Sequence, residues 1–77
     1  MEDKHMYAPS QAIVIAAHFG ITLEVQADHL VKGMYDPDYF IGYLASQIAI
    51  EADDHSGEFW DLKCLEIEGF LMENDLY

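Results

Sequence analysis

Two segments in the second half of the chain carry apolar residues at helical spacing, and this pattern constrains the fold most. The first, residues 36–53, opens with Asp36-Pro37, where an aspartate suits a helix cap and a proline suits the first helical position. Its apolar residues fall on one stripe, formed by Phe40, Ile41, Leu44, Ala45, Ile48 and Ala52. The second, residues 58–74, has a stripe formed by Trp60, Cys64, Ile67 and Leu71. The spacing predicts two amphipathic helices.

The stretch 8–20 is also predicted to be helical. Its alanines outnumber its β-branched residues, Pro9 suits a first helical turn, and Gly20 suits a helix end. Because almost every side of this helix would be apolar, we expect it to be the most buried element. Its β-branched run, residues 13–15, also suits a strand, and the alternative fold therefore has a hairpin over residues 12–25.

Residues 22–34 show a further helical stripe, and Thr22 suits its cap. The stripe consists of Leu23, Ala27, Leu30, Val31 and Met34. The run AAHFGITLEVQADHL, residues 16–30, resembles a helix-turn-helix motif, although Gln26 stands where that motif has an apolar residue. Because the second helix would present acids to a phosphate backbone, we expect a scaffold rather than a DNA reader.

Together these segments predict an all-α fold, a compact bundle of about four short helices. It forms a single domain over residues 1–77, with a flexible N-terminus at 1–7; the alternative is an α+β fold with the hairpin. A single cysteine excludes an internal disulfide, and the N-terminus lacks a signal-peptide pattern. The longest apolar run, residues 12–17, is too short to span a bilayer, so we expect a cytoplasmic protein with no membrane contact.

The charge of the chain excludes several classes of partner. Fifteen acids stand against three lysines and no arginine, and the net charge is −12. Residues 36–77 hold eleven of the acids and only Lys63, a net charge of −10. DNA and anionic membranes would repel such a chain, and it lacks the arginines that nucleic-acid readers use. We expect no direct binding to nucleic acid, and a basic protein as the partner; the alternative is that the acids serve only solubility.

The run EADDHSGEFWD, residues 51–61, has the composition of a metal site but not the spacing of one. Counted from Asp53, its residues do not match a calcium-binding loop, and His55 stands without a second zinc ligand nearby. We expect instead a turn in which Ser56 or Asp54 caps the last helix, with Glu58 in its first turn. No nucleophile motif surrounds a serine, and a small chain leaves little volume for a substrate pocket. We therefore expect no enzyme, no metal and no cofactor.

Tyrosines and acids near this run form the predicted partner-binding surface. Tyrosine buries a large area at low entropic cost, and an acidic rim would steer a basic partner toward it. The predicted residues are Tyr39, Tyr43, Glu51, Asp53, Asp54, Glu58 and Asp61. The alternative, which the sequence leaves open, is that Tyr35, Tyr39 and Tyr43 line the core.

The last predicted helix has a second apolar strip, nearly opposite the first. It consists of Leu65, Gly69 and Met72, with acids on both sides: Asp61 and Glu68 on one, Glu66 and Glu73 on the other. An apolar strip that does not face the core can bury itself against a second chain. These three residues are therefore the predicted self-association site of a possible homodimer.

These features predict a small, acidic, stoichiometric binding or inhibitor protein that occupies a basic, nucleic-acid-binding surface of another protein. In size and charge the chain resembles small acidic phage proteins that block host defence or transcription, including DNA-mimicking anti-CRISPR proteins. No motif assigns it to one family, so no site residues follow from this resemblance. The alternative function is a homodimeric helical adaptor or transcriptional regulator.

Overall fold

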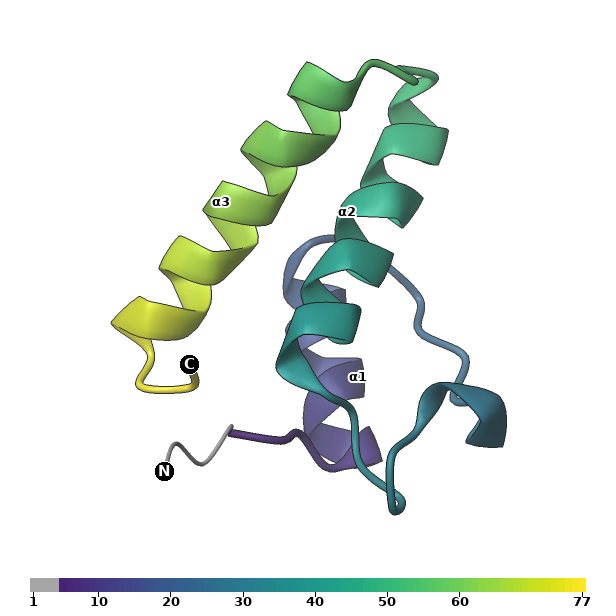
Figure 1. The fold of residues 1–77 in the computed structure, drawn as a ribbon, viewed down its shortest axis with the longest axis vertical. Helices are drawn as coiled ribbons and strands as arrows, with labels where there is room; N and C mark the ends of the chain where they lie inside the picture. Colours follow the sequence, from purple (N-terminus) through teal and green to yellow (C-terminus); the bar gives the residue numbers. More distant parts are fainter. Residues whose placement is uncertain (1–4) are drawn as a thin grey trace.

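The computed structural model describes residues 5–77, and over that range it has three α-helices and no sheet (Figure 1). The elements are α1 (Pro9–His18), a single 3₁₀ turn η1 (Ala27–His29), α2 (Pro37–Ala52) and α3 (Gly57–Glu73). The all-α class is confirmed. The expected number of about four helices is too high, because residues 22–34 do not form one. No helix in 5–77 is long and apolar enough to cross a bilayer.

Helices α2 and α3 lie side by side and antiparallel, joined by a short turn at one end of the molecule (Figure 1). Asp36 caps α2 as predicted, since its Oδ2 accepts from the backbone N–H groups of Asp38 and Tyr39 at 3.1 and 3.2 Å. Ser56 caps α3 by accepting from the N–H of Phe59 at 3.2 Å. Both caps satisfy N–H groups that a helix start leaves without partners.

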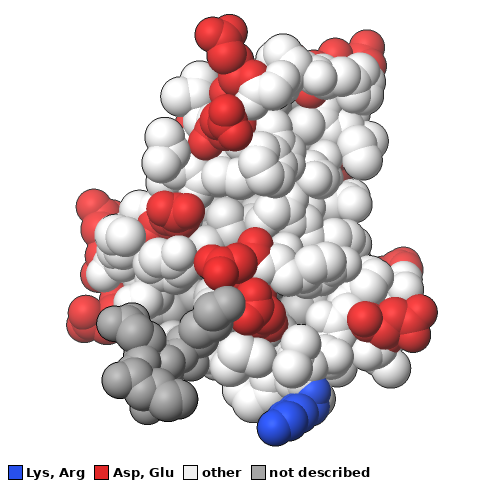
Figure 2. Space-filling view, viewed as in Figure 1, with Lys and Arg blue, Asp and Glu red and all other residues white. Residues whose placement is uncertain are grey.

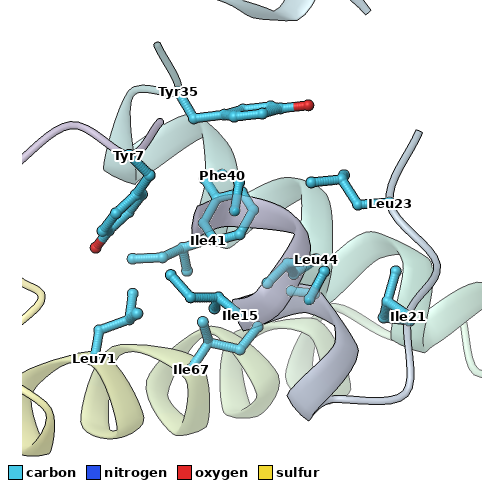
Figure 3. Packing of buried hydrophobic residues seen from close by; sticks show 13 residues of the cluster. Tyr7, Ile15, Ile21, Leu23, Tyr35, Phe40, Ile41, Leu44, Ile67 and Leu71 are labelled. Carbon is cyan, nitrogen blue, oxygen red and sulfur yellow. The ribbon is translucent and has the colours of Figure 1, made fainter. Parts of the chain in front are cut away.

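The core lies where the three helices meet (Figure 3). Helix α2 contributes Phe40, Ile41, Leu44 and Ala45, and α3 contributes Ile67 and Leu71. The predicted stripes are confirmed at these positions. Ile48 and Cys64 are half-buried and pack against this core. The stripes fail only at their ends nearest the α2–α3 turn, where Ala52 is exposed and Trp60 is 38% exposed. Helix α1 lies beside the other half of α2, so no further helix of residues 5–77 covers the turn end of the hairpin (Figure 1).

Residues 9–18 form a helix, so the alternative hairpin over 12–25 is wrong. The expectation that this helix is the most buried element is also wrong, because Val14 is 70% exposed. One side of α1, with Ala12, Ile15 and Ala16, faces the core. A helix of ten residues at the edge of so small a domain has neighbours on one side only, so the apolar residues on its other side stay in solvent.

The stretch 22–34 is extended apart from η1, which corrects the predicted helix, its Thr22 cap and the helix-turn-helix resemblance. Leu23 is buried, whereas Ala27 and Val31, from the same predicted stripe, are exposed. At the end of the stretch, Val31 and Met34 exchange backbone hydrogen bonds across a tight turn with positive φ at Lys32 and Gly33. An extended chain lets Leu23 and Tyr35 reach the core from both ends of the segment, whereas a short helix gains little stability without packing.

Tyr7 and Tyr35 join the N-terminal segment to the segment before α2. Each donates its backbone N–H to the other's carbonyl, at 3.0 and 2.8 Å, and both side chains are fully buried around Phe40 (Figure 3). The Tyr7 hydroxyl donates to the carbonyl of Leu76, which ties the two ends of the described chain together. Residues 1–4 of the segment predicted to be flexible, 1–7, lie outside the described residues; its last residue is in the core.

Candidate functional site

The indole of Trp60 lies across α2 at a position that the sequence of α2 prepares. A Cβ added to Gly42 would stand 3.4 Å from Cζ2 of the indole, so the ring packs against bare backbone. One helical turn further along, the Ser46 Oγ accepts a hydrogen bond from the indole Nε1 at 3.0 Å. Gly42 and Ser46 thus hold the ring in place, while 38% of Trp60 remains exposed.

Three adjoining hollows share Trp60, and we call them together the Trp60 groove. The hollow at the α2–α3 turn has a volume of about 370 Å³ and is lined by Ile50, Asp54, His55 and Asp61 among others. A second, of about 400 Å³, extends to Tyr39 and Tyr43. A third, of about 270 Å³, extends to Cys64 and Glu68. The lining is mostly apolar, and the chain has more concave surface than its size suggested.

Carboxylates border the Trp60 groove along its whole length. Asp54 and Asp61 line the turn end, and Asp38 and Glu68 line the other end. Among residues 5–77, no lysine lines any of the three hollows. Lys63, the one basic residue after residue 35, is held by Glu66 at 3.2 Å and lies over the ring of Phe59. On the face of the molecule shown in Figure 2, aspartates and glutamates form several patches that are separated by uncharged surface. The groove therefore combines an apolar floor with a negative rim.

Asp54 shows how the turn keeps one of these charges in place. Its Oδ1 accepts from both the backbone N–H and the hydroxyl of Ser56, at 3.0 and 2.8 Å. These two hydrogen bonds favour the ionised form and hold the pKa of Asp54 below its usual range. The predicted turn is confirmed, and of the two caps that the sequence offered, Ser56 or Asp54, it is Ser56 that caps α3.

The structure separates the predicted partner-binding residues into two groups. Asp54, Asp61, Tyr39 and Tyr43 line the Trp60 groove. The other three, Glu51, Asp53 and Glu58, are exposed but line none of its hollows. Sequence reasoning missed Trp60, which it assigned to the core stripe. The signal that could have revealed it is the pair Gly42 and Ser46, a small residue and a hydroxyl one turn apart on α2.

The tyrosines do not form one surface. Tyr35 is fully buried, Tyr39 is 44% exposed and Tyr43 is half-buried. The rings of Tyr39 and Tyr43 stack with their centroids 6.2 Å apart, and His29 of η1 packs against both at 5.6 Å. The sequence left open whether these tyrosines line the core. The structure places Tyr35 in the core and Tyr39 at the groove.

The reactive side chains that line the groove include His55, Ser56 and Cys64. Within residues 5–77, no three His, Cys, Asp or Glu side chains come together in a way that could hold a metal ion. Cys64 is half-buried, and burial raises the pKa of its thiol, helped by the charges of Asp61 and Glu68. A thiol with a raised pKa is a poor nucleophile at neutral pH.

The predicted self-association strip lies on the solvent side of α3. Leu65 and Met72 are largely exposed, and so is Gly69 between them. Leu62, which the sequence interpretation left out, extends the strip toward the start of the helix and is equally exposed.

No family model, curated protein or solved structure matches this chain. Its function is therefore inferred from the Trp60 groove and this outer strip.

Proposed function

We propose that this chain is a small acidic stoichiometric binding protein that occupies a basic, nucleic-acid-binding surface of a partner protein. The observation that supports this most is the Trp60 groove, which has a partly exposed indole on its floor and, within the described residues 5–77, carboxylates but no lysine on its rim. Exposed tryptophan and tyrosine are the side chains that most often anchor a protein interface. Carboxylates around them raise the rate of encounter with a basic partner and exclude acidic ones.

The net charge favours a protein partner over a nucleic acid. At −12, the chain repels phosphate backbones, and carboxylates spaced along its surface can stand in for phosphates. A protein of this kind competes with DNA or RNA for its partner's basic surface. Inhibition of a host defence nuclease in the cytoplasm, as by DNA-mimicking anti-CRISPR proteins, is the leading example that we propose.

The test is a pull-down from nuclease-treated lysate of the native host with four baits. The first three are the wild type, Trp60→Ala, and the reversal Asp53→Lys/Asp54→Lys at the α2–α3 turn, where Asp54 lines the groove and Asp53 is exposed next to it in the chain. The fourth bait, Glu24→Lys/Asp28→Lys, changes the net charge equally at two exposed residues that line none of the three hollows. We expect the wild type and the fourth bait to retain a basic nucleic-acid-binding protein, and added salt to release it. Trp60→Ala and Asp53→Lys/Asp54→Lys should not retain it. Equal retention by all four baits would refute the proposal.

A homodimeric adaptor or regulator is the second candidate, favoured by the exposure of Leu65 and Met72. In that case the acids serve only solubility. Sedimentation equilibrium distinguishes the two candidates, because a homodimer has twice the monomer mass and dissociates when Leu65 is replaced by glutamate. The variants Trp60→Ala and Asp53→Lys/Asp54→Lys would leave such a dimer intact.

A further inference from the structure

The outer face of α3 carries a continuous apolar stripe that the monomer does not use. It consists of Leu62, Leu65, Gly69 and Met72, and its three large side chains are 58%, 63% and 56% exposed. The stripe spans about 15 Å along the helix axis and lies nearly opposite Ile67 and Leu71, which face the core. It lies on a different side of α3 from Trp60, and the carboxylates that border it on one side, Asp61 and Glu68, also line the Trp60 groove.

Gly69, in the middle of the stripe, has no role within the described chain. Its backbone has no positive φ, and a Cβ added there would meet no atom within 4 Å. Glycine weakens a helix interior relative to alanine, so the fold alone gives no reason for it. On an exposed apolar stripe, however, a missing side chain lets the backbone of a second helix approach closely.

The charges beside the stripe indicate what kind of second helix could pack on it. Acids border the stripe on both sides: Asp61 and Glu68 on one, Glu66 and Glu73 on the other. The only lysine of α3, Lys63, bonds to Glu66 and offsets its charge, so the remaining border charges are Glu73 on that side and Asp61 and Glu68 on the other. A second copy of this chain would place acids against acids along both borders, which is unfavourable. A helix with lysines or arginines on both sides of its own apolar stripe would meet opposite charges along both borders.

We propose that the outer stripe of α3 binds an amphipathic helix of another protein whose apolar face is flanked by basic residues. The partner helix lies along α3, with its closest approach at Gly69 and its basic side chains beside the bordering glutamates and aspartate. This inference goes beyond the proposed function: it shares the carboxylates Asp61 and Glu68 with the Trp60 groove but does not use the indole.

The test uses a fluorescently labelled synthetic peptide of about five helical turns, with leucines on one face and lysines on both sides of them. The control peptide has the same leucines and glutamates in place of the lysines. We expect the lysine peptide to bind the wild type at least about tenfold more tightly than the glutamate peptide in fluorescence anisotropy. Equal binding of the two peptides would overturn the proposal.

Three protein variants separate binding at the stripe from general attraction to an acidic protein. Leu65→Glu places a charge in the stripe, and Val14→Glu places the same charge on an equally exposed apolar residue of α1. Gly69→Leu fills open space and should stabilise α3 while blocking close approach. We expect Leu65→Glu and Gly69→Leu to weaken binding of the lysine peptide at least about tenfold, and Val14→Glu to leave it within about twofold.

Two results count against the proposal. If all three variants bind the lysine peptide like the wild type, the attraction is not located at the stripe. If sedimentation equilibrium shows a dimer that Leu65→Glu dissociates, the stripe binds a second copy of the chain. Trp60→Ala should bind the peptide like the wild type, so that a failure of the groove proposal is distinguishable from a failure of this one.

Discussion

At the scale of the residue, two buried tyrosines differ in what their hydroxyl groups contact. Tyr7 and Tyr35 are both fully buried, but the Tyr7 hydroxyl donates to Leu76, whereas that of Tyr35 has no hydrogen-bond partner within residues 5–77. We expect Tyr7→Phe to lower the free energy of unfolding by about 1 kcal/mol and Tyr35→Phe to leave it unchanged or raise it. Urea denaturation of the two variants checks this, and equal losses would contradict it.

The same tyrosine sets the behaviour of the fold in alkali. Burial raises the pKa of Tyr7 from 10.0 to about 12. A raised folded pKa means that the fold favours the neutral phenol, so the stabilisation is complete below pH 10 and is lost as pH rises through about 12. Melting temperatures measured across this range should fall more steeply for the wild type than for Tyr7→Phe, which cannot ionise there.

A further residue-scale prediction concerns the position of Trp60 over Gly42. A Cβ at residue 42 would make an ordinary contact with the indole at 3.4 Å, so we expect Gly42→Ala to be tolerated. Gly42→Leu should displace the ring, lower stability by roughly 1–3 kcal/mol and shift the emission of Trp60 to longer wavelength. Since Trp60 is the only tryptophan, fluorescence reports on the groove alone. Unchanged emission in Gly42→Leu would contradict the packing described.

At the scale of the element, the start of α3 depends on one hydroxyl. Ser56 caps the helix and also donates to Asp54, which places the turn beside the Trp60 groove. We expect Ser56→Ala to lower the free energy of unfolding by about 1 kcal/mol. Ser10→Ala is the matched control, because Ser10 is exposed in the first turn of α1 and α1 has no side-chain cap. Equal thermal shifts in both variants would argue against the cap.

At the scale of the whole molecule, the net charge of −12 opposes compaction through self-repulsion. Added salt screens this repulsion, so we expect the melting temperature to rise with sodium chloride concentration. Glu24→Lys/Asp28→Lys reduces the net charge to −8, and its melting temperature should rise less with salt. A wild type insensitive to salt would mean that neighbouring hydrogen bonds, as at Asp54, already compensate the charges.

The sequence by itself determined the features that depend on neighbouring residues. The capping carboxylate of Asp36, the proline after it, the Ser56 cap and the stripe through Phe40 and Leu44 all act within one or two helical turns. Local hydrogen bonding and periodicity therefore suffice to predict them. The outer strip of α3 was found from the sequence for the same reason, since Leu65 and Met72 share a face whether or not the helix packs.

Only the tertiary structure decided which apolar positions are covered and by what. Trp60 fits the core stripe of α3 by spacing, yet it is partly exposed. Its position depends on Gly42 and Ser46, which contact the indole from α2 only once the two helices have packed together. Residues 22–34 have helical periodicity, yet Leu23 reaches the core only from an extended chain. Periodicity tells which residues share a face, but the free energy of burial depends on the distant segment that the face meets.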